Sequence, residues 1–224
     1  MKIPAIYKVH PLMIKQDSND IEFDRVDRDH IKFLTQNMFL LPPPNLTGIK
    51  HHKDIRVLEF CRSFMQDYDI ICFQETFTTL NTRKQMLIEI GEASGFSYHA
   101  RCQPPSLFTG KLTDSGLLIL SRFPIVESEF QSYGIGVFSD GISNKGVLFA
   151  RIKVKDQYLN VFNTHLNASY VSTNLQELKS SLDVREQQLE QLRDFINVKI
   201  DQFGEKDLYI LCGDLNVDSN PEAI

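Results

Sequence analysis

From Ile31 onward, short apolar runs alternate with longer amphipathic stretches, and this alternation constrains the fold more than any other feature of the sequence. The runs have the length of β-strands and are rich in Ile, Leu, Val and Phe. We expect strands at 31–38, 69–74, 115–121, 146–154, 158–163 and 207–212, and helices near 51–66, 82–93 and 183–203. Strands interleaved with helices predict an α/β layered domain. Lys155-Asp156 joins two of the runs and is typical of a hairpin, so the sheet is mixed or antiparallel.

The size and charge of the chain bound its organisation. With 224 residues, 42% of them hydrophobic, the chain is large enough for one sizeable core. Residues 1–29 are polar and lack sustained apolar periodicity, so we interpret them as an N-terminal extension to a domain that covers 30–224. The formal net charge of -5 argues against a basic surface that wraps nucleic acid. Nucleic acid is therefore not an expected partner.

The cysteines and the apolar stretches indicate in which cellular compartment the protein is expected. The four cysteines are scattered without close spacing, which is typical of free thiols in a reducing environment. The printed sequence shows neither a signal-peptide pattern nor a run of about 18 apolar residues. We therefore expect an intracellular protein, either cytoplasmic or peripheral at a membrane.

Polar side chains follow four of the predicted strands, at the point where each run ends. The four segments are Thr35-Gln-Asn37, Cys72-Phe-Gln-Glu75, Phe162-Asn-Thr-His165-Leu-Asn167 and Cys212-Gly-Asp214-Leu-Asn216. Such groups are costly inside a sheet but suit its rim, where open sheets collect ligands. Mg²⁺ prefers oxygen ligands and is usually held by one or two carboxylates together with substrate phosphate oxygens. If the strand ends converge, the sequence predicts a site for Mg²⁺ and phosphate.

Each segment alone also fits ordinary surface structure. A glutamate after a strand is commonly a solvated turn residue, and a Gly-Asp-x-Asn run is often an Asx-turn. Carboxylate, amide and imidazole groups that recur after four separate apolar runs are harder to explain as unrelated surface residues. Asp214 and Asn216 lie two residues apart, so in an extended segment they share one face.

The order of these segments resembles the motif series of the endonuclease/exonuclease/phosphatase superfamily, whose members are two-layer mixed β-sandwiches flanked by helices, of the DNase I-like kind. Two further segments resemble the neutral and bacterial sphingomyelinase branch: Asp114-Ser-Gly-Leu-Leu-Ile-Leu-Ser-Arg-Phe-Pro-Ile125, and Ser143-Asn-Lys-Gly146 before an apolar strand. The stretch Arg185-Glu-Gln-Gln-Leu189 resembles that branch as well. The resemblance implies a Mg²⁺-dependent phosphodiesterase that hydrolyses sphingomyelin to ceramide and phosphocholine. Because the substrate would be a membrane lipid, we also expect peripheral contact with a membrane surface.

The resemblance further implies roles for the strand-end residues. Glu75 would be the principal metal ligand, and Asn37 would lie against the metal and the phosphate. Asp214 and Asn216 would position the attacking water and the phosphate, and His165 would contact the phosphoryl oxygens.

Two residues before the 146–154 strand are expected on the substrate side. These are Asn144 and Lys145. Taken alone, Lys145 is more typical of a solvated residue than of a substrate-binding cation, because an exposed lysine needs no special explanation.

The end of the sequence departs from the family pattern. That pattern closes with a Ser-Asp-His-like segment whose histidine is the general base, whereas this chain ends with Pro221-Glu-Ala-Ile224. We therefore expect a domain that is incomplete at its C-terminus and lacks the final Asp-His segment. Because a general base contributes about 10²- to 10⁴-fold, we also expect this chain to be inactive or weak.

Three alternatives remain open. A DNase-like nuclease would share Glu75, Asp214 and Asn216, although the acidic balance argues against it. An inositol polyphosphate phosphatase would need a cluster of Lys and Arg for several phosphates, which the sequence does not display. A catalytically silent module would keep the metal and phosphate contacts without the base.

Overall fold

The computed structural model describes residues 30–42, 52–105, 110–169 and 175–217. All the strands and helices described below lie within Ile31–Ile224. The predicted extension 1–29 lies outside the described residues. In the described part of the chain, no helix combines the length and the apolar character needed to cross a membrane.

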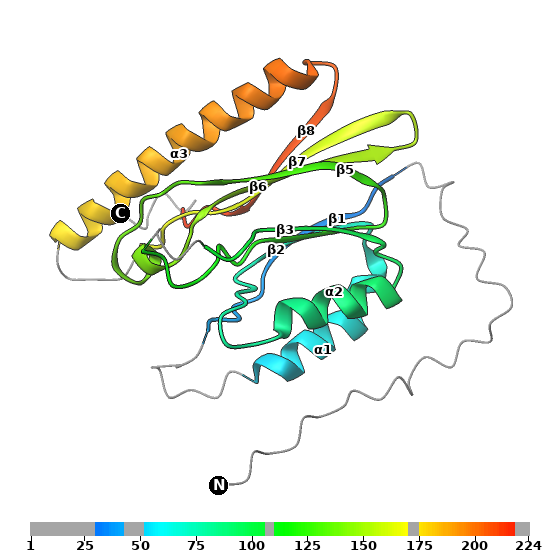
Figure 1. Ribbon diagram of the computed structural model, residues 1–224, viewed down its shortest axis with the longest axis horizontal. Coiled ribbons are helices and arrows are strands. Elements are labelled where there is room, and N and C mark those ends of the chain that lie inside the picture. Colours follow the sequence, from blue (N-terminus) through cyan, green and yellow to red (C-terminus); the bar gives the residue numbers. More distant parts are fainter. Residues whose placement is uncertain (1–29, 43–51, 106–109, 170–174, 218–224) are drawn as a thin grey trace, which may run out of the picture. The chain divides into compact units, whose positions relative to one another are not determined.

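The described strands form two four-stranded sheets (Figure 1). The first sheet has the order β1 (Phe33–Asn37), β2 (Ile70–Gln74), β4 (Leu118–Ser121) and β3 (Tyr98–Arg101). The second sheet has the order β5 (Ile125–Ser132), β6 (Gly146–Val154), β7 (Gln157–His165) and β8 (Leu208–Asp214). Each sheet contains one parallel pair, β1 with β2 and β7 with β8, and its other pairs are antiparallel. The expected mixed topology is therefore confirmed.

The central strands bury side chains on both faces. In β2, Ile70 and Cys72 belong to the cluster between the sheets, whereas Ile71 and Phe73 belong to the cluster under the helices. Adjacent residues alternate in this way because successive strand side chains point to opposite faces. A strand that is buried on both faces reads as a continuous apolar run, which is why β2, β4, β6 and β7 were predictable.

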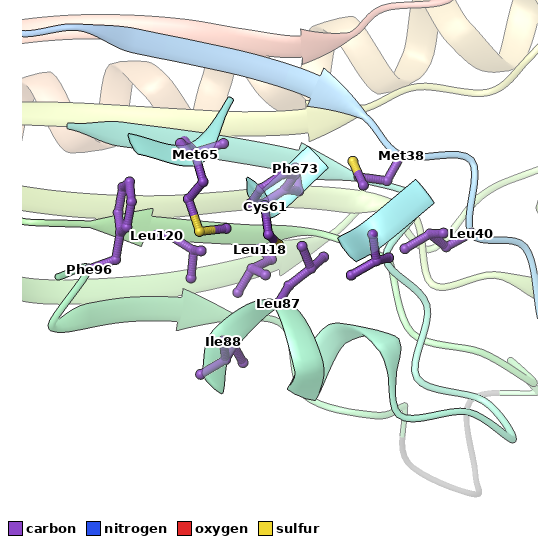
Figure 2. Packing of buried hydrophobic residues seen from close by; sticks show 12 residues of the cluster. Met38, Leu40, Cys61, Met65, Phe73, Leu87, Ile88, Phe96, Leu118 and Leu120 are labelled. Atoms are coloured by element: carbon purple, nitrogen blue, oxygen red, sulfur yellow. The ribbon is translucent and has the colours of Figure 1, made fainter. Parts of the chain in front are cut away.

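Helices cover the outer face of each sheet (Figure 1). The helices α1 (Lys53–Ser63) and α2 (Arg83–Ala93) pack on the first sheet, and Figure 2 shows Cys61, Leu87 and Ile88 directed at Phe73, Leu118 and Leu120. The long helix α3 (Leu175–Phe203) covers the second sheet through Leu192 and Phe195, which pack on Phe149 and Phe162. Two 3-10 turns complete the described elements, η1 (Met65–Asp67) and η3 (Phe138–Ile142).

Several boundaries differ from the prediction. The helix α3 begins at Leu175 rather than at Asp183, and β7 and β8 run on to His165 and Asp214. Two edge strands, β3 and β5, were not predicted because both are short of buried apolar residues and carry charged or polar side chains. The hairpin at Lys155-Asp156 is confirmed, since Val154 pairs with Gln157.

Candidate functional site

The predicted strand ends meet at one edge of the two sheets. β1 and β2 run parallel in the first sheet, and β7 and β8 run parallel in the second. The Asn37 side chain joins the two sheets because its Nδ2 donates to Glu75 Oε1 at 2.8 Å and to Asp214 Oδ2 at 2.9 Å. One amide thus bridges carboxylates that come from different sheets.

Glu75 occupies the residue directly after β2. Its backbone is in the left-handed region, with φ 56°, and its side chain is largely buried. Burial raises the pKa of Glu75, although the hydrogen bond from Asn37 and the Lys145 cation act in the opposite direction. The second carboxylate oxygen, Oε2, is buried and finds no hydrogen-bond partner among the described residues.

Asp214 ends β8 and is more accessible than Glu75. Its Oδ1 accepts a hydrogen bond from the Asn216 amide at 3.0 Å. Burial alone would raise the pKa of Asp214, but the hydrogen bonds from Asn37 and Asn216, with the nearby His165 and Lys145, lower it. Asp214 therefore remains a carboxylate at neutral pH.

His165 ends β7 beside Asp214. Its Nε2 lies 3.9 Å from Asp214 Oδ2, and its buried Nδ1 has no hydrogen-bond partner among the described residues. Burial, followed by the Lys145 cation, lowers the pKa of His165 to about 4. The imidazole is therefore neutral at pH 7, with one N–H to donate and one lone pair.

Glu75, His165 and Asp214 form a cluster that could hold a cation. Each offers one ligand atom, and these atoms all lie within 4.8 Å of one another. A buried carboxylate oxygen without a partner, such as Glu75 Oε2, is costly, and a bound cation would offset that cost. Two carboxylates suit Mg²⁺, which prefers oxygen ligands. The donor set therefore fits the predicted metal.

Asn37 contacts the carboxylates through its nitrogen. Its Oδ1 accepts a hydrogen bond from the Phe39 amide at 2.9 Å, so the amide donates to Glu75 and Asp214. In this arrangement Asn37 positions the carboxylates, and its predicted place against the metal stays a prediction.

Asn216 lies at the mouth of the site. Its backbone has φ 52°, and its Nδ2 donates to Leu166 O at 2.9 Å. An open cavity of about 560 Å³ is lined by Asn37, Asp214 and Asn216, among other residues. The predicted water- and phosphate-positioning residues thus face solvent that a substrate could replace.

Lys145 lies behind the cluster. Its side chain is 2% exposed, its Nζ donates to Leu166 O at 3.0 Å, and it pairs with Asp140 Oδ1 at 3.2 Å. Burial lowers the pKa of Lys145, whereas Asp140, Glu75 and Asp214 partly restore it. The interpretation of Lys145 as a solvated residue is therefore wrong.

Asn144 is held by two hydrogen bonds in the segment before β6. Its Oδ1 accepts a hydrogen bond from Ser132 Oγ, and its backbone amide donates to Thr113 O at 3.0 Å. These bonds fix the segment before β6. Its predicted contact with substrate stays a prediction.

A buried amide pair behind the site was not predicted as functional. Gln74 Nε2 donates to Asn163 Oδ1 at 2.7 Å, and Asn163 Nδ2 donates to Phe73 O and Leu118 O. These bonds join the two sheets directly beneath the strand ends. Both residues stood in the strand-end segments, but their partners come from distant parts of the chain. Asp140, which pairs with Lys145 and accepts a hydrogen bond from the Ala168 amide, was also missed.

The site can be compared with known proteins. Residues 45–223 match the model of the Endonuclease/Exonuclease/phosphatase family. A sphingomyelinase of Dictyostelium discoideum is 39% identical over 178 residues, which are 70% of this chain and 38% of that protein. Sphingomyelinase C of Bacillus cereus is 26% identical over 199 residues, which are 84% of this chain and 57% of that protein. The chain thus spans less than two thirds of the length of these curated relatives.

Solved structures show the same fold. Sphingomyelinase C of Streptomyces griseocarneus superposes with a TM-score of 0.72 at 25% identity, covering 85% of this chain and 65% of that one. A Staphylococcus aureus beta toxin with bound magnesium ions has a TM-score of 0.72 at 21% identity, covering 86% of this chain and 67% of that one. The described sheets and helices therefore have the DNase I-like arrangement of these proteins. The family model covers well over half of the sequence, and the chain belongs to the endonuclease/exonuclease/phosphatase family.

Proposed function

We propose that this chain carries the metal- and phosphate-binding part of a Mg²⁺-dependent phosphodiesterase that hydrolyses sphingomyelin to ceramide and phosphocholine. The observation that carries the proposal is the cluster of Glu75, His165 and Asp214, in which the buried Glu75 Oε2 lacks a hydrogen-bond partner among the described residues. The similarity to sphingomyelinases of Dictyostelium discoideum and Bacillus cereus supports the choice of substrate.

The residues divide the work of phosphodiester cleavage. Glu75 and Asp214 would hold Mg²⁺, which when bound offsets the negative charge of the phosphate. The neutral His165 donates its N–H to a phosphoryl oxygen, where negative charge grows in the transition state. Asn216 holds the phosphate and the water whose oxygen attacks phosphorus as the bond to the ceramide oxygen breaks.

The attacking water must also lose a proton, and the leaving ceramide oxygen must gain one to become a hydroxyl. His165, with a pKa of about 4, is a weak acceptor at neutral pH. The family resemblance assigns the base to an Asp-His segment instead. Mg²⁺ binding therefore tests the proposed site independently of the base.

The test measures phosphocholine release from sphingomyelin vesicles, with Mg²⁺ and with EDTA. We expect release that requires Mg²⁺ and falls at least about 100-fold in Glu75→Gln, which keeps the side-chain volume but removes the charge. Glu89→Gln, at an exposed position on α2, is the matched control and should behave as wild type. Calorimetry should show Mg²⁺ binding by the control and little binding by Glu75→Gln.

The alternatives give different results in the same assays. Cleavage of DNA, or phosphate release from inositol polyphosphates, without release from sphingomyelin would reject the lipid substrate. Mg²⁺ binding without turnover of any of these substrates would favour the silent module.

We also propose that the loops beside the site face a membrane surface. Leu80 and Leu112 are 81% and 70% exposed, and Leu112 N donates to Ile142 O at 2.8 Å, which ties two of these loops together. Exposed apolar side chains beside a phospholipid site suit the boundary between headgroups and acyl chains. Co-sedimentation with sphingomyelin vesicles should weaken in Leu80→Ser/Leu112→Ser. It should be unchanged in Leu208→Ser, at the start of β8, and equal binding by both variants would reject this orientation.

A further inference from the structure

A buried ion pair lies on the first-sheet side of the site and has no part in the proposed chemistry. Lys84, in the first turn of α2, places its Nζ 2.6 Å from Asp114 Oδ2. The two side chains are 1% and 0% exposed. Taking such a pair out of water costs several kcal/mol per ion, so an apolar pair would serve a core at least as well. The pair therefore calls for a role beyond filling space.

Asp114 uses both of its oxygens to fix a turn. Oδ1 accepts a hydrogen bond from the Gly116 amide at 3.2 Å, and Oδ2 accepts one from Thr78 Oγ1 at 3.1 Å as well as the Lys84 bond. The first of these bonds closes an Asx-type turn over Asp114-Ser-Gly116. Lys84 thus holds a carboxylate that in turn determines the backbone of Gly116.

Gly116 is in direct contact with the backbone of Glu75. Its carbonyl oxygen accepts hydrogen bonds from the Thr76 amide and from Thr76 Oγ1, both at 2.8 Å. Gly116 has φ 71°, and a Cβ at this position would lie 3.0 Å from Glu75 Cα. The turn therefore fits against Glu75 without room for a side chain.

Glu75 needs such support because of its own conformation. A residue with a side chain pays about 1–2 kcal/mol for the left-handed region, and such a conformation persists only where its surroundings impose it. At φ 56° the backbone of Glu75 is in that region. Thr76, the next residue in the sequence, donates the two hydrogen bonds to Gly116 O that hold this part of the backbone.

We propose that Lys84 and Asp114 are positioning residues for Glu75. The ion pair locks the Asp114–Gly116 turn, the turn holds Glu75 in its left-handed conformation, and that conformation directs the carboxylate at the cation. The inference rests on the proposed function, in that Glu75 is taken as a Mg²⁺ ligand. It also assigns a physical task to the Asp114 segment, which the proposed chemistry leaves unused.

Two double variants separate positioning from simple packing. Lys84→Met/Asp114→Asn removes both charges but keeps an oxygen that can accept from the Gly116 amide. Lys84→Met/Asp114→Leu removes both charges and the acceptor. Mg²⁺ affinity is measured by calorimetry on the full chain, and unfolding is followed in urea. We expect the Asn variant, which loses the ion pair but keeps the turn acceptor, to lose about three- to tenfold in affinity, and the Leu variant to lose about 10- to 100-fold, as for other residues that orient metal ligands. Wild-type affinity in the Asn variant would remove Lys84 from the positioning role.

A variant of Gly116 tests the same route without touching the ion pair. Gly116→Ala places a methyl group against Glu75 and should also weaken Mg²⁺ binding about tenfold or more. Gly204→Ala is the matched control, because Gly204 has φ 90° and nothing lies within 4 Å of its added Cβ. It carries comparable backbone strain and should leave Mg²⁺ binding unchanged. This pair also decides the question if the Leu variant does not fold.

The outcomes distinguish the inference from the proposed function. Wild-type Mg²⁺ affinity in folded Leu and Gly116→Ala variants would overturn the positioning role while leaving the metal site intact. Equal losses in the Asn and Leu variants would also overturn it, because the turn acceptor would then be irrelevant. A wild-type chain that binds no Mg²⁺ would reject the metal site itself, and the inference with it.

Discussion

The two carboxylates of the site come from strands in opposite surroundings. β2, which leads to Glu75, is buried along its whole length and is hydrogen-bonded to β1 and to β4. β8, which ends at Asp214, pairs with β7 alone among the described strands, and its Leu208 and Leu211 side chains are exposed. β2 is therefore held from both sides as far as Phe73, close to Glu75, whereas Asp214 depends on a few contacts at the end of a strand with one neighbour.

Those contacts are local and specific. The Leu166 amide donates to Asp214 O at 2.9 Å, and Asn37 Nδ2 donates to its side chain. Gly213 lies so close to β7 that a Cβ there would overlap Thr164 O. A strand with one neighbour can thus present a carboxylate accurately only where its last residues are tightly packed.

The largest expected effect is at that close approach. Gly213→Ala should lower the free energy of unfolding by about 4 kcal/mol, because overpacking against Thr164 adds to the strain of φ 137°. Urea denaturation followed by circular dichroism measures the change. Gly204→Ala shares the positive φ but has open space around it, so it should cost only about 1 kcal/mol. Similar losses in both variants would show that β8 is not held by its approach to β7.

The next effect concerns the amide that joins the sheets behind both carboxylates. Asn163→Ala should cost about 3 kcal/mol, because it leaves Gln74 Nε2 and two carbonyl oxygens without this partner. Asn160→Ala, at the far end of β7, removes one hydrogen bond, to Asp207, and should cost about 1 kcal/mol. The urea midpoints of the two variants provide the measurement. If both variants lowered the free energy of unfolding equally, Asn163 would have no special role in joining the sheets beneath the site.

A third prediction uses the opposite pKa shifts of the two carboxylates. The folded pKa of Glu75 is raised, so its ionisation removes stability as the pH rises through that value. The folded pKa of Asp214 is lowered, so this group contributes stability above its unfolded pKa and loses it as the pH falls through the folded one. In EDTA at pH 7, Glu75→Gln should therefore raise the melting temperature and Asp214→Asn should lower it. If both variants changed the melting temperature in the same direction, the two carboxylates would not have opposite effects on stability.

The same contrast explains what the sequence could predict. β2 was recognisable because burial on both faces produces an unbroken apolar run, and the polar residue that follows such a run stands out. Glu75 was predicted as a site residue in this way, whereas the mixed sheet was predicted from the hairpin at Lys155-Asp156. The edge strand β5 was not, because its half-solvated face carries Glu127 and Glu129. Pattern reasoning therefore works best where the chain is most buried.

The surroundings of the site were less predictable than its residues. Lys145 resembles a solvated lysine in sequence, yet it is buried against Asp140. Lys84 is a charged residue on a helix, and its partner Asp114 lies 30 residues away. The Lys84 pair forms only when the fold brings distant segments together, so local sequence carries no signal for it.

The smallest expected effect tests the exposed side of β8. Leu208 is 57% exposed, so Leu208→Thr, which keeps a good strand former, should change the free energy of unfolding by no more than about 0.5 kcal/mol. Ile71→Thr is the matched change on β2, where the side chain is fully buried, and should cost about 2 kcal/mol or more. Urea denaturation at two protein concentrations gives both values. If Leu208→Thr cost as much as Ile71→Thr, β8 would be covered in solution, and the two carboxylates would rest on equally buried strands.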